Sequence, residues 1–207
     1  MLKYGLALHS TSPQLGISLS NFTDDTRSQT WELGRDLSTH LHQHLIEFLG
    51  TTALKDLEFI AVAKGPGSFT GTRLGLVLAR TLGQQLNIPI FAISTLAAIA
   101  WSEKDKYLNN NKIAIQMDAR RSQLFVAIYE VKNDREGLIT HLPDTIITPK
   151  DWEQTLNSLP TKYQLIETPT KLGNTVTSLL NLAYFEWQKG ARPQWSEVLP
   201  FYGQHPV

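Results

Sequence analysis

The segment spanning residues 59–93 constrains the fold more than any other part of the chain. Residues 59–63 form a continuous apolar run, as a buried strand would, and the run stops at Gly65-Pro66-Gly67. A helical pattern follows over residues 70–86, and a second apolar run covers residues 88–93. Two consecutive strands joined by a helix form a parallel pair with a crossover connection. The sequence therefore predicts an α/β protein built around a parallel pair of buried strands.

The opening of the chain has a counterpart in its second half. Residues 3–19 and 112–128 superpose without a gap, and each reads as an apolar run, a polar turn and another apolar run. This pattern is typical of a β-hairpin. The polar stretch 102–111 separates the two halves. We therefore expect two related lobes, residues 1–106 and residues 107–207.

Other helices and strands are indicated more simply by periodicity. Leu37, Leu41 and Leu45 recur every four residues within a predicted helix over residues 31–49. The remaining predicted elements are a short helix over 95–101, a weak strand over 163–166 and a helix over 176–188.

Composition excludes several classes of function. The chain has 207 residues, somewhat more than one domain of ~150. Its 42% hydrophobic and 18% charged residues are typical of a globular protein. Nineteen basic residues balance 19 acidic ones, which disfavours a stand-alone nucleic-acid binder because such proteins carry a basic excess. The absence of cysteine excludes disulfides and thiolate metal sites, and no apolar stretch is long enough to span a membrane. We expect a cytoplasmic protein.

The glycine-rich connection after the first buried strand has two interpretations. Gly65 and Gly67 precede a helix whose start is marked by Ser68 or Thr70, and a helix N-terminus favours an anion. The block has neither the Gly-Lys-Ser/Thr of a phosphate-binding P-loop nor the spacing of a dinucleotide fingerprint. It is therefore either a tight strand-to-helix turn or a nucleotide-proximal loop.

The helix after this loop carries small residues at every fourth position. They are Gly71, Gly75, Ala79 and Gly83. A glycine inside a helix costs ~1 kcal/mol relative to alanine, so the stripe requires a reason, and close approach of another backbone is one. That backbone belongs either to the same chain or to a partner. We favour a partner, because Leu74 and Leu78 make the helix apolar over more than one face, with Arg73 and Arg80 flanking the contact.

Two polar clusters have weaker claims to a function. His40 and His44 have the spacing of zinc ligands on a helix, but the glutamate of the H-E-x-x-H motif is absent, and packing at the edge of the helix is favoured over metal binding. Arg120 and Arg121 lie in the turn of the second hairpin beside Asp118, where they form either a modest anion site or a solvated turn.

The block Ala61-Val62-Ala63-Lys64-Gly65-Pro66-Gly67-Ser68-Phe69-Thr70-Gly71-Thr72-Arg73-Leu74-Gly75 strongly resembles the signature of the bacterial TsaB (YeaZ) family. Residues 94–100 and Asp118-Ala119-Arg120-Arg121 continue the resemblance, which covers residues 2–131 and fades afterwards. Members of this family commonly open with Asp-Thr-Ser, whereas this chain has His9-Ser10-Thr11-Ser12. Pro200-Phe201-Tyr202 is similar to the family's Pro-x-Tyr ending without the arginine that usually follows.

The resemblance implies an actin-like (ASKHA, ribonuclease H-like) α/β fold of two related lobes, with mixed sheets flanked by helices. It also implies a partner subunit of the machinery that places a threonylcarbamoyl group on adenosine 37 of tRNAs reading ANN codons. The catalytic TsaD subunit holds a metal through paired histidines, and those positions fall on Thr95 and Ile99 here. We therefore expect no metal and no catalytic residue in this chain.

The same resemblance implies the partners. They are a TsaD-like catalytic subunit, a TsaE-like ATPase, a second copy of this chain in isolation, and tRNA only through the complex, with no membrane contact. The family pairs through two N-terminal helices, here residues 33–49 and 71–83. The expected interface residues are Leu37, Leu41, Leu45, Gly71, Arg73, Leu74, Gly75, Leu78, Ala79 and Gly83.

We expect this chain alone to bind no cofactor, while ATP could bind at its interface with the partner. Gly65, Gly67, Ser68, Thr70, Asp118 and Arg120 are the candidate phosphate-proximal residues. The main alternative is a free-standing actin-like kinase or ATPase, which would need a phosphate-binding carboxylate such as Asp118. A metallopeptidase is a third alternative, but its ligands and general base are missing from the sequence. For the interface, we expect Gly75→Leu to weaken partner binding while leaving the fold intact.

Overall fold

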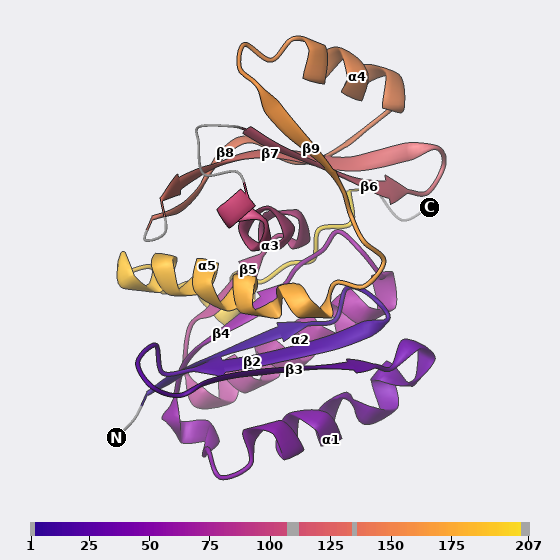
Figure 1. The fold of residues 1–207 in the computed structure, drawn as a ribbon. Coiled ribbons are helices and arrows are strands. Elements are labelled where there is room, and N and C mark those ends of the chain that lie inside the picture. Colours follow the sequence, from indigo (N-terminus) through magenta and orange to yellow (C-terminus); the bar gives the residue numbers. More distant parts are fainter. Residues whose placement is uncertain (1–2, 107–111, 134–135, 204–207) are drawn as a thin grey trace.

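Two mixed sheets, one above the other in Figure 1, form the frame of the computed structural model. The structure describes residues 3–106, 112–133 and 136–203, so part of the predicted boundary at 102–111 lies outside the described residues. The strands are β1 (Tyr4–His9), β2 (Gln14–Ser20), β3 (Thr26–Glu32), β4 (Leu57–Ala63), β5 (Ile90–Ile93), β6 (Lys112–Ala119), β7 (Gln123–Asn133), β8 (Gly137–Ile147) and β9 (Tyr163–Glu167). The helices are α1 (Leu37–Leu49), α2 (Phe69–Leu86), α3 (Thr95–Ser102), α4 (Pro149–Asn157) and α5 (Val176–Gln188).

The first sheet confirms the predicted hairpin and the predicted parallel pair. Its strand order is β3-β2-β1-β4-β5, with β1 antiparallel to β2 and parallel to β4. The strands β4 and β5 are parallel, with Ile60 opposite Ile90, and the helix α2 connects them. Strands β1 and β2 are buried along their whole length because helices cover both faces of this sheet.

The second sheet repeats the order of the first four strands. It runs β8-β7-β6-β9, with β6 antiparallel to β7 and parallel to β9. The two hairpins differ in the length of their turns. His9 pairs with Gly16, seven residues later, whereas Asp118 pairs with Leu124, six residues later. The gapless superposition of the two segments therefore holds for their first strands and is displaced by one residue beyond the turn.

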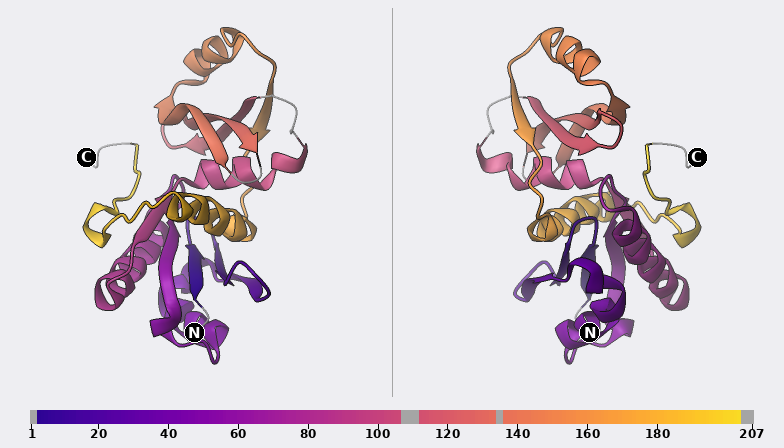
Figure 2. Two further views of the ribbon diagram at one scale, coloured as in Figure 1. Left: turned by 90° about the vertical axis from the view of Figure 1, so that its left-hand side faces the viewer. Right: turned by 90° about the vertical axis from the view of Figure 1, so that its right-hand side faces the viewer.

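Helices cross from each half of the chain to the other. On the first sheet, α1 and α2 pack against one face, while α5 covers the opposite face through Val176, Leu179 and Ala183. The helix α3 packs against the second sheet through Leu96 and Ile99. The boundary between the two sheets thus lies near residue 106. Residues 173–203, however, pack largely on the first lobe. The side views in Figure 2 show this for α5 and the C-terminal segment.

The small-residue stripe of α2 packs inside the chain. A Cβ atom added at Gly71 would lie 2.0 Å from the Ser10 carbonyl oxygen, and one at Gly75 would lie 2.3 Å from Ser10 Oγ. A Cβ atom at Gly83 would lie 2.4 Å from Ile90 Cδ1, and Ala79 is fully buried. The close approach inferred from the stripe is confirmed, but the neighbour is the first sheet and its β1–β2 turn. Of the two alternatives, the structure supports a neighbour in the same chain, while contact of these residues with a partner stays a prediction.

Several element boundaries differ from the sequence prediction. The helix expected from residue 31 begins at Leu37, because Trp31 belongs to β3 and Gly34 has a positive φ of 53°. The strands β3 and β8 and the helix α4 were not predicted at all. The predicted helix over 176–188 is confirmed at both ends.

Candidate functional site

The glycine-rich loop docks on the β1–β2 turn. Gly65 and Gly67 have φ values of 99° and 152°, and a Cβ atom at Gly67 would lie 2.3 Å from the Thr11 carbonyl oxygen. The Ser68 N–H donates to that same oxygen at 2.7 Å, and Ser68 Oγ accepts from the Gly71 N–H at 3.2 Å. Glycine is thus required where two backbones touch, and Ser68 is the helix cap. The Ser68 N–H binds the turn and does not face an open anion site. Thr70, two residues further along, is exposed.

The β1–β2 turn is covered by the segment that leads into α5. The Leu172 N–H donates to Ser12 Oγ at 3.2 Å, and the Gly173 N–H donates to Gln14 Oε1 at 3.0 Å. A Cβ atom at Gly16 would lie 2.2 Å from the Gly173 carbonyl oxygen. The β1–β2 turn is therefore packed against the segment that leads into α5.

His9, which replaces the expected aspartate, is buried at the end of β1. Its side chain has no exposure, and neither ring nitrogen has a hydrogen-bond partner among the described residues. Burial lowers the pKa of the imidazole from 6.5 to about 3, because charging it would remove a cation from water without compensation. The ring is therefore neutral at physiological pH.

The positions that match the metal-binding histidines of TsaD lie in the interior. Thr95 has no exposure, and its Oγ1 lies 3.1 Å from Thr11 Oγ1. Ile99 is buried and packs in the cluster beneath the second sheet. Neither residue is a histidine, and both side chains are packed against other parts of the chain.

The two polar clusters of the sequence analysis lie on separate surfaces. Asp118 and Arg120 are exposed in the β6–β7 hairpin, whose turn is formed by Arg121 and Ser122 with positive φ. A Cβ atom added at Gly65 or Gly67 would lie nearest to atoms of Phe201, Thr72 and Thr11, so the glycine loop packs on the C-terminal segment and on the β1–β2 turn.

The histidines of α1 belong to a packing surface. His44 stacks on Trp31 with ring centroids 4.7 Å apart, and His40 Nδ1 lies 3.2 Å from the Asp36 carbonyl oxygen. Over the described ranges, no group of three or more potential metal ligands converges. The prediction that these side chains edge a packed face is confirmed for His44.

Most of the expected interface residues are buried within the chain. Apart from Arg73 and Leu74, all of them are in the interior: Leu37, Leu41, Leu45, Gly71, Gly75, Leu78, Ala79 and Gly83. The leucines of α1 and α2 instead fill the core between these helices and the first sheet. If these helices bind a partner, other side chains on them must form the contact.

The outer face of α2 carries such side chains. Phe69 is 49% exposed and Val77 is 63% exposed, and with Arg73 between them they lie one helical turn apart on one face. The Arg73 guanidinium lies over the Phe69 ring at 3.7 Å, and Arg73 Nε donates to the Tyr202 hydroxyl at 2.6 Å. The Phe69 and Tyr202 rings have centroids 5.0 Å apart. We call Phe69, Arg73, Val77 and Tyr202 the α2 outer face; periodicity alone could not separate it from the buried stripe.

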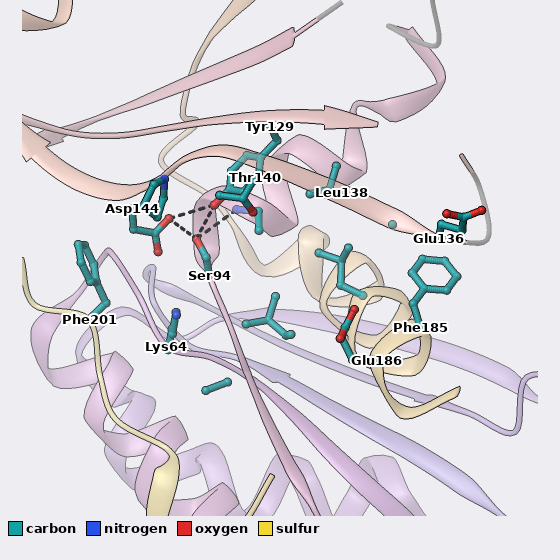
Figure 3. A pocket seen from close by; sticks show the side chains of 16 residues that line it. Lys64, Ser94, Tyr129, Glu136, Leu138, Thr140, Asp144, Phe185, Glu186 and Phe201 are labelled. Atoms are coloured by element: carbon teal, nitrogen blue, oxygen red, sulfur yellow. Dashed lines mark hydrogen bonds between the residues drawn. The ribbon is translucent and has the colours of Figure 1, made fainter. Parts of the chain in front are cut away.

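A pocket between the lobes is the other distinctive feature (Figure 3). It has a volume of about 340 Å³, and its polar lining includes Lys64 at the end of β4, Ser94 before α3, Tyr129 on β7 and Asp144 on β8. Lys64 and Ser94 lie in segments that carry the family resemblance, but none of these four residues was predicted as a site residue. The Pro143-Asp144 pair inside an apolar pattern was the available signal, because proline within a strand marks an edge or a bulge.

Comparison with known proteins gives the class first. The family model described as "TsaD: tRNA N6-adenosine threonylcarbamoyltransferase" matches residues 36–170. Two solved structures from Pseudomonas aeruginosa share the fold. YeaZ has a TM-score of 0.78 over 97% of this chain and 100% of its own, at 21% identity. A protein described as similar to peptidase YEAZ has a TM-score of 0.79 over 98% and 100%, at 20% identity. The chain is therefore an α/β protein of the actin-like, ribonuclease H-like class.

The nearer relatives share one description, "tRNA threonylcarbamoyladenosine biosynthesis protein TsaB". The Bacillus subtilis protein is 41% identical over 50% of this chain and 43% of its own length, and the Buchnera aphidicola (Schizaphis graminum) protein is 31% identical over 72% and 68%. The first match thus spans less than half of that relative. The chain belongs to the TsaB (YeaZ) family of tRNA threonylcarbamoyladenosine biosynthesis proteins. In the part of the chain that the structure describes, no helix has the length and hydropathy needed to cross a membrane.

Proposed function

We propose that this chain is a non-catalytic partner subunit in the synthesis of threonylcarbamoyladenosine at position 37 of tRNAs reading ANN codons. It acts by binding a TsaD-like subunit, on which the transfer takes place. The observation that carries the proposal is the α2 outer face. An exposed Phe69–Arg73–Val77 row lies on a helix whose opposite side is fixed in the core, so the row is held rigidly and open to a partner.

The chemistry of this face suits a protein contact. Exposed aromatic and arginine side chains are enriched at protein interfaces. Arg73 is already ordered by the Phe69 ring and the Tyr202 hydroxyl, so binding would cost little side-chain entropy there. Residues from the helix and from the C-terminal segment thus form one surface, although they are far apart in the sequence.

Two features support a non-catalytic role. Thr95 and Ile99 stand where TsaD has its histidines, and both are buried. The β1–β2 turn accepts hydrogen bonds from the Leu172 and Gly173 backbone, which supports a turn that packs against protein and does not bind a nucleotide. For these reasons we propose that any ATP binds at the interface with the partner and not to this chain alone.

The finer partnerships follow from the same proposal. A second copy of this chain would use the α2 outer face in the absence of the catalytic subunit, a TsaE-like ATPase would join the assembled pair, and tRNA would be bound through the complex. A chain without cysteine that serves tRNA modification is expected in the cytoplasm.

A pair of matched substitutions tests the proposal. Val77→Glu places a charge in the α2 outer face, while Leu165→Glu places the same charge on an exposed apolar residue of β9 in the other lobe. Val77→Glu should reduce co-purification with the TsaD-like subunit of the same organism at least tenfold, whereas Leu165→Glu should bind as the unaltered chain does. Equal binding by both variants, with folding verified by circular dichroism, would refute the proposed face.

The rival function is tested in the same preparation. A free-standing kinase or ATPase would hydrolyse ATP as an isolated chain and lose that activity in Asp118→Ala. We expect no ATP hydrolysis above background from the isolated chain.

A further inference from the structure

The interlobe pocket holds a carboxyl group that the chain satisfies on one side only (Figure 3). Asp144 Oδ1 accepts hydrogen bonds from Ser94 Oγ at 2.7 Å and from the Tyr129 hydroxyl at 3.1 Å. Asp144 Oδ2 is buried and has no hydrogen-bond partner among the described residues. Buried polar atoms are normally paired, so this oxygen requires an explanation.

The hydrogen bonds of Ser94 determine which oxygen of the Asp144 carboxyl accepts and which oxygen lacks a donor. Ser94 Oγ accepts from the Leu96 N–H at 3.0 Å and from the Ala97 N–H at 3.2 Å, so its one hydrogen is directed to Asp144. Oδ1 is therefore an acceptor. Burial raises the pKa of the Asp144 carboxyl, while the bond from Ser94 and the nearby charge of Lys64 oppose that rise. A cationic donor at Oδ2 would stabilise the ionised form and complete its hydrogen bonding.

A bulge aims Asp144 at the pocket. Val126 faces Thr145 and Ile128 faces Leu142, so Pro143 and Asp144 together oppose a single residue of β7. Such a bulge redirects side chains and is common beside functional sites. The geometry of β8 thus departs from a regular ladder at the residue whose carboxyl enters the pocket.

Lys64 supplies the opposite charge on the other wall. Its backbone is fixed between the lobes, since its N–H donates to the Ile93 carbonyl and its carbonyl accepts from the Phe201 N–H at 2.8 Å. Within the described residues, the Lys64 ammonium forms no salt bridge, although Asp144 lines the same cavity. By contrast Glu186, also in the lining, is paired with Lys189 at 2.7 Å.

We propose that this pocket binds a small zwitterion, a free α-amino acid with an apolar side chain, with its ammonium at Asp144 and its carboxylate at Lys64. A simple cation would meet Lys64, and a simple anion would meet Asp144, whereas an α-amino acid satisfies both. The cavity of about 340 Å³ lies within the range of small-molecule sites. Its walls include Leu138, Leu182, Phe185 and Phe201, which suit an apolar side chain. The site involves none of the residues of the α2 outer face, so the proposal does not depend on the partner.

The test is calorimetric titration of the full chain with L-leucine, L-methionine and L-phenylalanine. At least one should bind at a single site. Its methyl ester, which lacks the carboxylate, and its N-acetyl derivative, which lacks the ammonium, should each bind on the order of tenfold to hundredfold more weakly, since each loses one charge-assisted hydrogen bond.

Variants assign the two ends of the ligand. Asp144→Asn keeps an acceptor for Ser94 but removes the charge, and it should weaken binding at least tenfold. Lys64→Met should also weaken binding at least tenfold. This variant replaces Asp144→Asn in the test if Asp144→Asn does not fold. Glu153→Gln, at an exposed carboxylate of α4 outside the pocket lining, is the control and should bind as the unaltered chain does. The proposal is overturned if none of the three amino acids binds at millimolar concentration, or if ester and N-acetyl derivatives bind as well as the parent.

Discussion

The buried imidazole of His9 predicts a specific dependence of stability on pH. In the folded chain its pKa is about 3, while in the unfolded chain it returns to its ordinary value of 6.5. Above pH 6.5 the ring is neutral in both states and contributes no pH dependence. Below pH 6.5 the unfolded state binds a proton that the folded state does not, so the free energy of unfolding falls as the pH falls, until the folded ring also protonates near pH 3.

The size of this loss follows from the two pKa values. Each pH unit between them removes about 1.4 kcal/mol. At about pH 5, roughly one and a half units below the unfolded value, His9 alone should lower the free energy of unfolding by about 2 kcal/mol. This is a substantial part of the ~5–15 kcal/mol that holds a typical domain folded.

The measurement compares urea unfolding near pH 7.5 and pH 5 for the unaltered chain and for His9→Leu. All other titrating groups are common to both proteins, so the difference between their pH-dependent losses isolates His9. The unaltered chain should lose about 2 kcal/mol more than His9→Leu. A control variant, His42→Leu on the exposed side of α1, should retain the full loss. If the unaltered chain and His9→Leu lose the same free energy, the ring is not buried in the neutral form and the reasoning fails.

Further predictions concern α2. The sequence alone led us to expect that Gly75→Leu leaves the fold intact, but its Cβ would lie 2.3 Å from Ser10 Oγ, so it should destabilise the fold by about 2–3 kcal/mol or more. Thr81→Leu on the exposed side of the same helix should be nearly neutral in thermal unfolding. Gly71→Ala should be destabilising for the same reason, since its Cβ would meet the Ser10 carbonyl at 2.0 Å. Ser68→Ala should cost about 1 kcal/mol in chemical unfolding, because it removes the cap that accepts the Gly71 N–H.

The elements that the sequence predicted well are those whose signal lies in their own residues. The helix α5 and the strands around the glycine loop carry strong apolar periodicity or continuous runs, and they appear as predicted. The strand β3 was missed because it is polar and lies at the edge of the sheet, where its hydrogen bonds to β2 decide its structure. The strand β8 was missed because Pro143 interrupts the pattern, and the bulge that accommodates it is visible only in the pairing with β7.

The candidate site shows the same division. The stripe on α2 correctly indicated a close backbone approach, but its neighbour, the turn at Ser10, comes from a part of the chain that no local pattern connects to the helix. The pocket at Asp144 depends on three separate strands and a helix start, so its members could not be grouped before the fold was known. Sequence periodicity specifies which face of an element is buried and does not specify what covers it.

The crossing of α3 and α5 fixes the junction between the two lobes. Here the segment leading into α5 donates to Ser12 and Gln14, while α5 itself is packed on the first sheet. Opening the turn would break those hydrogen bonds and also strip apolar surface from both lobes, because α3 is buried against the second sheet. A junction fixed in this way holds the α2 outer face and the Asp144 pocket in constant geometry, as the proposed binding role requires.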